Sequence, residues 1–296
     1  MWSHKPPIQS KDEKLDSSFD FILSSPAKTN LFFRVIFKRP DGFHEIASLY
    51  QAISFFDSIC FRKNGSFAVT STDPTLPVDH SNLVYRAADL FFKKTGIQPS
   101  VHLHLIKSIP IQAGLGGGSG NAATVLWGLN ELFGAKVSVQ DLALWSATLG
   151  CDVPFFFSQG TAYCTGKGDL FTEEGVPQIK GEVTIVKPIE SLSTPLVYSC
   201  SNPLEFQSRD PHLSLQGFSL DQGPFYNDLE IPAFKLLPAL EQLRDALLLA
   251  GFSHVVLSGS GSAFFCLGKP KTPDLPANCL IKKARFIQRT HTGWYE

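Results

Sequence analysis

Several features that define other classes of protein are missing from this sequence of 296 residues. No stretch approaches the roughly 18–20 consecutive apolar residues that a membrane helix needs. Lys plus Arg (26) nearly balance Asp plus Glu (27), which gives a formal net charge of −1. A chain with so little net charge has no bulk attraction to nucleic acid or to an anionic membrane. We therefore expect neither as a partner, and any anion site must be local.

Clustered cysteines are also missing. The six cysteines are scattered, mostly in apolar segments, and form no CxxC pair. This distribution predicts free, buried thiols in a reducing compartment, and hence a cytoplasmic protein. Zinc would need clustered ligands, whereas His102 and His104 merely alternate along one face of a predicted strand.

A targeting signal is not evident at the N-terminus. The first 18 residues are polar and include three acidic residues, so they lack the apolar core of a secretory signal. We interpret residues 1–18 as a flexible leader. The rest, in a chain that is 43 % apolar, is long enough for two packed domains.

Strands and helices alternate irregularly along the chain, which predicts an α+β architecture. Residues 19–37 are interpreted as two strands separated by an irregular passage at residues 26–30. A turn follows at RPDGFHE (residues 39–45). Further strands are predicted at residues 46–55, 58–70, 101–107 and 183–186, and a strand–glycine turn–strand unit at residues 254–268. Helices are predicted from Ser81 or Asn82 as N-cap to Lys94, after residue 120, from the N-cap Ser138 to Leu149, and near residues 229–250.

Composition shifts at residues 166–181, where glycine, charge and proline gather. We therefore place the domain boundary there, with an N-terminal domain at residues 19–170 and a C-terminal domain at residues 171–296.

Glycine is concentrated in PIQAGLGGGSGNAAT (residues 110–124), with five glycines in residues 114–120. A strand is predicted before this loop and a helix after it. Such a loop aims several backbone N–H groups at one point, and the helix dipole adds positive potential there. The sequence therefore predicts a phosphate site.

The two commonest phosphate loops do not fit this one. A Walker A loop ends in Gly-Lys-Ser/Thr, but no lysine follows Gly118 or Gly120. The dinucleotide fingerprint needs glycines at relative positions 0, 2 and 5, and counting from Gly114 the third position is Ser119. A plain connection between strand and helix would need only a few residues.

PxxxGLGGGSxNAAT resembles the nucleotide-phosphate loop of the GHMP kinase superfamily. Four more motifs fall in the order and spacing of one branch, whose members phosphorylate a cytidine-diphosphate-linked methylerythritol in the non-mevalonate route to isoprenoids. They are SPAKTNLFF (residues 25–33), RPDGFHE, LGCDVPFF (residues 149–156) and LSGSGSAFF (residues 257–265). The resemblance covers residues 21–265. It implies a two-domain GHMP kinase fold: an N-terminal mixed α/β domain with the glycine-rich phosphate loop, and a C-terminal α/β sandwich domain.

The resemblance also implies an ATP site. The ATP-binding residues would be Pro110, Gly114, Leu115, Gly116, Gly117, Gly118, Ser119 and Gly120, with Asn82 and Lys107 on the adenosine side. Ser119 would offer its hydroxyl to a phosphate or to Mg²⁺. Superfamily members often carry a second hydroxyl at the position of Gly120, so its absence leaves the Mg²⁺ ligands open.

Two residues would carry the chemistry by the same resemblance. Asp152 would accept the proton of the acceptor hydroxyl. Lys28 would keep Asp152 ionised and steady the phosphoryl group in flight. The alternative reading makes Asp152 a polar residue at a helix end and Lys28 a surface lysine.

The acceptor would be recognised by five residues. Phe43 and Tyr198 would stack on the cytosine, and His44 would hydrogen-bond its edge. Asn30 would position the acceptor, and Thr194 would line the same pocket. Relatives often have tyrosine at the position of Phe43, so stacking survives here but a phenolic hydroxyl is lost.

Two other functions stay open at this point. A GHMP-type enzyme with another acceptor, such as a sugar alcohol, homoserine or mevalonate, or of the decarboxylase branch, is favoured if Phe43, His44 and Tyr198 lie away from the acceptor. A non-catalytic nucleotide or phosphate sensor predicts loss of the Lys28–Asp152 pair. We expect a monomer or weak homodimer, and we assign no role to residues 285–296.

Overall fold

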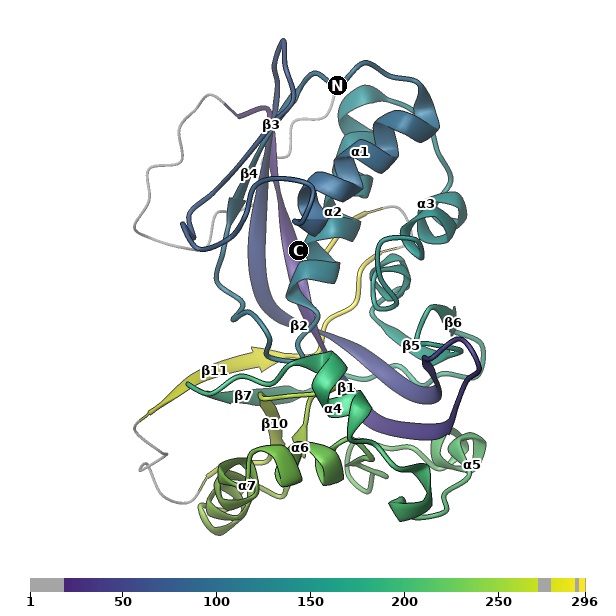
Figure 1. The fold of residues 1–296 in the computed structure, drawn as a ribbon, viewed down its shortest axis with the longest axis vertical. Coiled ribbons are helices and arrows are strands. Elements are labelled where there is room, and N and C mark those ends of the chain that lie inside the picture. Colours follow the sequence, from purple (N-terminus) through teal and green to yellow (C-terminus); the bar gives the residue numbers. More distant parts are fainter. Residues whose placement is uncertain (1–18, 271–277, 291–292, 296) are drawn as a thin grey trace.

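The structure, a computed structural model, describes residues 19–270, 278–290 and 293–295. The predicted leader at residues 1–18 lies outside the described residues. Two β-sheets form the framework, and helices cover them (Figure 1). The mixture of strands and helices expected from the sequence is confirmed. Among the described residues, no helix is both long and apolar enough to cross a bilayer.

The first sheet has seven strands, and its main path runs β3-β4-β2-β1-β8, with β5 pairing to both β2 and β6. Its centre is a long antiparallel pair, β1 and β2, which runs through the middle of the molecule (Figure 1). The strands are β1 (Phe21–Lys38), β2 (His44–Lys63), β3 (Ala68–Ser71), β4 (Val101–Ile106), β5 (Thr161–Thr165), β6 (Leu170–Thr172) and β8 (Tyr226–Asn227).

The predicted break at residues 26–30 is wrong, because β1 continues through it. Pairing with β2 persists, and register shifts between Pro26 and Ala27 and between Asn30 and Phe32 absorb the irregularity. Such bulges change the direction of side chains without ending a strand, and they allow polar residues within a buried strand pair. The predicted gap between residues 55 and 58 is likewise bridged, so β2 is one strand. The predicted turn at RPDGFHE is confirmed, with the N–H of Arg39 donating to the carbonyl of Phe43.

Helices α1 (Leu83–Thr95) and α2 (Gly117–Phe133) pack side by side on one face of the first sheet, and α3 (Val139–Ser146) and the 3₁₀ turn η1 (Pro154–Phe157) follow (Figure 1). The predicted caps are confirmed. The Asn82 side chain accepts from the N–H of Val84 at 2.8 Å, and Ser138 accepts from the N–H of Asp141 at 3.1 Å. Helix α3 ends at Ser146, three residues before the predicted end.

The second sheet has four strands in the order β11-β7-β10-β9. Helices α6 and α7 lie below it in Figure 1. The predicted strand at residues 183–186 and the predicted strand–glycine turn–strand unit are both confirmed. The elements of this half are β7 (Glu182–Pro188), α4 (Thr194–Ser199), η2 (Pro203–Glu205), α5 (Pro211–Gln216), α6 (Glu230–Leu236), α7 (Ala239–Leu249), β9 (His254–Leu257), β10 (Phe264–Leu267) and β11 (Cys279–Arg285).

Segments from the second half of the chain also reach the first sheet. Strand β8 pairs in parallel with β1 at Phe32 and Phe33, and Phe286 forms a bridge with Ile53. The chain changes from the first sheet to the second between β6 and β7. The boundary expected near residue 170 stays a prediction.

Candidate active site

A cavity of about 940 Å³ opens where the glycine loop, the central strands and the second sheet's glycine turn meet. Segments far apart in the sequence line it: β1 and β2, the turn between them, the loop before α2, the segment after α3, and α4. Of the residues predicted for the site, those that line the cavity are Lys28, Phe43, His44, Asn82, Lys107, Pro110, Gly114, Leu115, Gly116, Gly117, Gly118, Ser119, Asp152, Thr194 and Tyr198.

The glycine loop wraps over the stem of Lys28. The backbone N–H of Lys28 donates to the carbonyl of Leu115 at 2.8 Å. A Cβ on Gly116 would lie 2.8 Å from Lys28 Cγ, and the residue has a φ of +66°. Both the close approach and the left-handed backbone therefore require glycine here. Within the described residues, no side chain caps α2, whose first turn (Gly117, Gly118 and Ser119) faces the cavity. Unsatisfied N–H groups at the positive end of a helix form an anion site.

A second glycine loop, residues 258–263, packs against the first. A Cβ on Gly114 would lie 1.9 Å from the carbonyl oxygen of Ser258, so the two backbones touch. Ser258 Oγ donates to the carbonyl of Gly114 at 3.0 Å. Asn227 in turn donates to the carbonyls of Leu257 and Gly259, both at 2.7 Å. The phosphate loop is therefore fixed by the other sheet.

Asp57 fixes the start of the same loop, and the sequence analysis did not find it. Its fully buried carboxylate accepts from Lys107 Nζ at 2.7 Å and from the N–H groups of Ser108 and Ile109 at 2.7 and 2.8 Å. Asn121 of α2 donates to it at 2.9 Å. Lys107 is thereby held at the N-terminus of α2. The only clue to Asp57 in the sequence is that it is an acidic residue inside an apolar strand.

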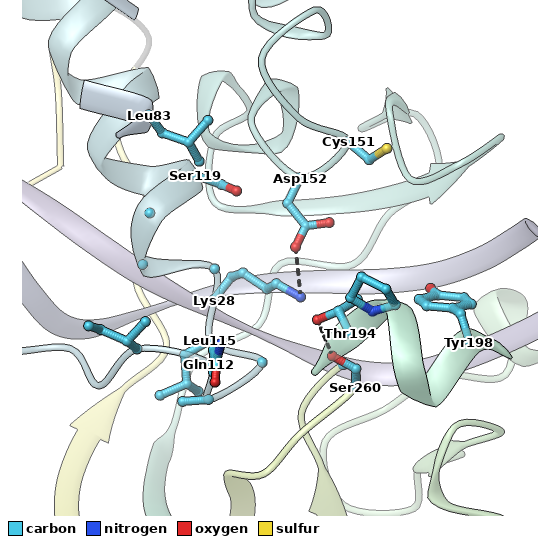
Figure 2. Close-up of a pocket in the computed structure, with 18 of the residues that line it drawn as sticks. Lys28, Leu83, Gln112, Leu115, Ser119, Cys151, Asp152, Thr194, Tyr198 and Ser260 are labelled. Carbon is cyan, nitrogen blue, oxygen red and sulfur yellow. Dashed lines mark hydrogen bonds and ion pairs between the residues drawn. The ribbon is translucent and has the colours of Figure 1, made fainter. Parts of the chain in front are cut away.

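Lys28 and Asp152 face one another across the cavity (Figure 2). Lys28 Nζ lies 3.3 Å from Asp152 Oδ2, and Lys28 is only 2 % exposed. Nζ also donates to Asn30 Oδ1 at 2.8 Å, and Asn30 donates to Ser48 Oγ at 3.0 Å. Lys28 is thus a buried, partnered cation, which contradicts the surface-lysine reading.

Tyr50 contacts both members of this pair. Its hydroxyl donates to Asp152 Oδ1 at 3.1 Å, and its ring lies 4.6 Å from Lys28 Nζ. Burial, with Asp152 close by, raises the pKa of Tyr50 well above its usual range, so the hydroxyl stays a neutral donor. Tyr50 pairs with Asn30 across β1 and β2. This register places Tyr50 on the same face of the sheet as Lys28, and the sequence without the strand pairing does not reveal it.

Aromatic groups line another part of the cavity. The rings of His44 and Tyr198 lie 5.2 Å apart, and Phe43 is 51 % exposed beside them. Burial, reinforced by the charge of Lys38, lowers the pKa of His44, so its ring is neutral near pH 7. His44 Nε2 is buried and has no hydrogen-bond partner among the described residues. A buried polar atom of this kind is suited to a ligand's hydrogen bond.

Some side chains that line the cavity were not predicted from the sequence. Lys167 Nζ lies 4.8 Å from the centre of the Phe43 ring, and Cys151 precedes Asp152. Ser260, in the second glycine loop, shares a hydrogen bond of 2.7 Å with Thr194 (Figure 2).

Two of the predicted residues lie behind the lining. Asn30 is fully buried and accepts a hydrogen bond from Lys28 Nζ. A Cβ on Gly120 would lie 2.5 Å from the carbonyl oxygen of Pro26. This close approach of α2 to β1 leaves no room for a second hydroxyl at that position.

The chain matches two protein-family models. The model for the GHMP kinases N terminal domain matches residues 82–160, and the model for the GHMP kinases C terminal domain matches residues 207–278. Homoserine kinase from Cytophaga hutchinsonii has the same fold, with a TM-score of 0.67 at 17 % identity over 95 % of this chain and 98 % of that one. Together with the phosphate loop, these matches define the chain as an ATP-dependent GHMP kinase of mixed α/β, two-domain fold.

More similar relatives define the branch. A 4-diphosphocytidyl-2-C-methyl-D-erythritol kinase of Protochlamydia amoebophila is 44 % identical over 96 % of both chains. The chloroplastic enzyme of Mentha piperita is 41 % identical over 92 % of this chain and 71 % of its own. A crystal structure of a 4-(cytidine 5'-diphospho)-2C-methyl-D-erythritol kinase matches with a TM-score of 0.77 at 34 % identity, over 90 % of this chain and 99 % of that one. The chain belongs to the 4-diphosphocytidyl-2-C-methyl-D-erythritol kinase family.

Proposed function

We propose that the chain transfers the γ-phosphoryl group of ATP to the 2-hydroxyl of 4-diphosphocytidyl-2-C-methyl-D-erythritol, a step in making isoprenoid precursors. The observation that carries the proposal is the position of the Lys28–Asp152 pair. It lies in one cavity with the phosphate loop and with Phe43, His44 and Tyr198. A donor site, a charged pair and an aromatic acceptor site are thus contiguous.

In the proposed step, the acceptor oxygen forms a bond to the γ-phosphorus while the bond to the β,γ-bridging oxygen breaks, and ADP leaves. The proton of the acceptor hydroxyl goes to the Asp152 carboxylate. Lys28 Nζ, 3.3 Å from that carboxylate, stabilises the negative charge that develops on the transferred group. The backbone N–H groups at the start of α2 hold the remaining phosphates. Positioning and charge compensation account for most of catalysis in reactions of this type.

For the acceptor, we propose that Phe43 and Tyr198 stack on the cytosine and that His44 Nε2 hydrogen-bonds its edge. Three observations support this: the exposure of Phe43, the ring contact between His44 and Tyr198, and the buried Nε2 of His44, which has no hydrogen-bond partner in the described part of the chain. Stacking needs only an aromatic face, so Phe43 serves as well as tyrosine. Thr194 fixes the start of α4 through Ser260, and Asn30 acts by orienting Lys28.

The donor set fits a Mg²⁺ shared with ATP. The Ser119 hydroxyl and the Asp152 carboxylate, both oxygen donors, face the cavity (Figure 2). Among the described residues, no cluster of three or more His, Cys, Asp or Glu could hold a metal alone. Mg²⁺ prefers one or two protein oxygens plus phosphate oxygens. We propose Ser119 as its protein ligand; when bound, the ion neutralises phosphate charge.

The open alternatives are less well supported by these contacts. A sensor without catalysis would not need the buried Lys28–Asp152 pair. An acceptor that carries no nucleobase would leave Phe43, His44 and Tyr198 without a ligand group to contact. The free state of all six cysteines supports the proposed cytoplasmic location.

The test is an assay of ADP release with ATP and Mg²⁺, in which the cytidyl-diphosphate acceptor is compared with mevalonate and homoserine. We expect turnover with the first alone, and a new phosphomonoester on the tertiary 2-hydroxyl by ³¹P NMR. Turnover with mevalonate or homoserine, or phosphorylation at another hydroxyl, would contradict the assignment. A variant with His44→Ala should raise the acceptor KM about 10-fold or more, because it loses one specific hydrogen bond, and leave the ATP KM unchanged.

A further inference from the structure

Two donors hold the Asp152 carboxylate, one on each oxygen. Lys28 Nζ contacts Oδ2 at 3.3 Å, and the Tyr50 hydroxyl donates to Oδ1 at 3.1 Å. The χ2 torsion of aspartate is soft, so a carboxylate held through one oxygen can rotate. Contacts on both oxygens fix its plane. We infer that Tyr50 is a positioning residue, which orients Asp152 so that a remaining lone pair faces the acceptor hydroxyl.

The surroundings of Tyr50 fix the hydroxyl itself. The residue is 2 % exposed, and its ring packs edge-on against Phe155 at 5.3 Å. Phe155 lies in η1, three residues after Asp152, so Tyr50 contacts the segment that carries the base in two places. A Cβ on Gly168 would lie 3.0 Å from the Tyr50 hydroxyl and 3.8 Å from Asp152 Oδ1. Gly168 thus leaves just enough space for this hydrogen bond.

The side chain of Asp152 is 31 % exposed, which leaves the carboxylate open to the cavity. A carboxylate can accept about four hydrogen bonds, so two contacts leave room for the acceptor. The inference rests on the proposed function, in which Asp152 is the base.

Several other titratable groups face Asp152. They are Lys28 on β1, Cys151 next to Asp152 in the chain, Cys164 on β5 and Tyr198 on α4. Lys167 and Asp169 lie near Cys151. Burial raises the pKa of Cys151, Cys164 and Tyr198, so these groups do not titrate in acid. Asp169 is a nearby carboxyl group, and Asp169→Asn therefore serves as a control for the loss of a carboxylate elsewhere in this cluster.

The test compares Tyr50→Phe with Tyr226→Phe. Tyr226 is also buried, and its hydroxyl also shares one hydrogen bond, with Ser214 at 3.1 Å, but it does not line the cavity. For Tyr50→Phe we expect kcat to fall about 10-fold or more, since a hydrogen bond to a charged group is lost, with both KM values nearly unchanged. This split between kcat and KM is the readout, because a merely structural defect would also change the KM values. Tyr226→Phe should change stability only.

The outcomes are distinguishable. Wild-type kcat in Tyr50→Phe, with Asp152→Asn inactive, would overturn the role of Tyr50 alone. Retained activity in Asp152→Asn would overturn the base on which the inference rests.

If Tyr50→Phe does not fold, Gly168→Ala replaces it as the test. Its added Cβ presses on the same hydroxyl, whereas Gly175→Ala, at a φ of +70° with nothing within 4 Å, is the matched control. An equal kcat in these two alanine variants would also overturn the inference.

Discussion

At the scale of single residues, the site depends on a buried lysine that is paired with Asn30 and Asp152. Lys28 has its stem under Gly116 and its Nζ between Asn30 and Asp152. A buried charge survives in the folded state only when such partners compensate its desolvation. In the proposed step, the same partners hold the ammonium group in place, so that it would need little reorganisation as charge develops on the phosphoryl group.

Replacing Lys28 by methionine keeps the apolar stem and removes the charge. We expect kcat to fall by about 10²–10³, the usual cost of losing one preorganised donor in a catalytic site. Steady-state kinetics with ATP and the acceptor would measure it. Lys93→Met is the control, because Lys93 is exposed on α1 and pairs with Asp89 at the surface. A Lys28→Met enzyme within threefold of wild type would contradict the assigned role.

The residues that sequence reasoning found and missed differ in kind. Lys28 and Asp152 lie inside recognisable motifs, so a resemblance was enough to identify them. Asp57 and Tyr50 lie in an apolar strand, and their roles depend on partners about 50 and 100 residues away in the chain. The pairing of β2 with β4 reveals Asp57, and the pairing of β1 with β2 together with the approach of the segment that carries Asp152 reveals Tyr50.

At the scale of elements, two glycine loops from different sheets make one support. Gly114→Ala would place a Cβ 1.9 Å from Ser258 O, at a φ of +73°. Gly96→Ala is a close match in backbone, with a φ of +72°, but its Cβ would meet nothing within 4 Å. We expect Gly96→Ala to cost about 1 kcal/mol of stability from the left-handed backbone alone.

Gly114→Ala should cost at least about 2 kcal/mol more and weaken ATP binding at least 10-fold, because the loop must move. Urea unfolding and ATP titration would measure both effects. Equal stability and equal ATP affinity in the two variants would show that the loops do not support one another.

The C-terminal segment, for which the sequence predicted no role, stabilises residues 157–158, which follow Asp152 in the chain. The guanidinium of Arg289, a residue only 7 % exposed, donates to the carbonyl of Ser158 at 2.8 Å and also to that of Phe157. It lies 5.3 Å from the Trp127 ring. Arg289→Met should lower the free energy of unfolding by about 2–4 kcal/mol, because buried carbonyls lose their donors.

Thermal or urea unfolding would measure that loss. Arg244→Met is the control: Arg244 pairs with Glu241 and Asp245, two half-exposed carboxylates, and should cost less than about 1 kcal/mol. Equal losses of unfolding free energy in the two variants would contradict this stabilising role of Arg289.

At the scale of the whole molecule, the sequence predicted the class of fold and its motifs but not how the halves join. Alternating patterns and caps located most helices and the strand–turn–strand unit. The continuity of β1 and β2, strands β8 and β11, and the return of residues 286–290 to the first sheet arise from long-range pairing. Local periodicity carries no information about such pairing, and tertiary contacts override the local break signals at residues 26–30.

One partly buried carboxyl group gives the molecule a pH-dependent stability. Glu230, at the start of α6, accepts from the N–H of Leu257 at 2.9 Å, and burial raises its pKa to about 7. Between its unfolded value of 4.5 and about 7, the folded state holds a proton that the unfolded state has released. This contribution to stability is therefore present below pH 4.5, falls as pH rises through that window and levels off above it.

Glu230→Gln keeps an acceptor for Leu257 and removes the titration. We expect the variant to be more stable than the wild type by about 2 kcal/mol at pH 8, with a much smaller difference at pH 5. Urea unfolding at the two pH values would measure it. A difference that is the same at both would contradict the shifted titration of Glu230.

The central claim is that Asp152 takes the acceptor's proton while the phosphate loop holds ATP. The most direct measurement is single-turnover phosphoryl transfer by Asp152→Asn, with ATP affinity determined on the same protein. The account predicts that the chemical step slows by at least about 10²-fold while ATP binds within a few-fold of wild type. A chemical step at the wild-type rate would contradict it.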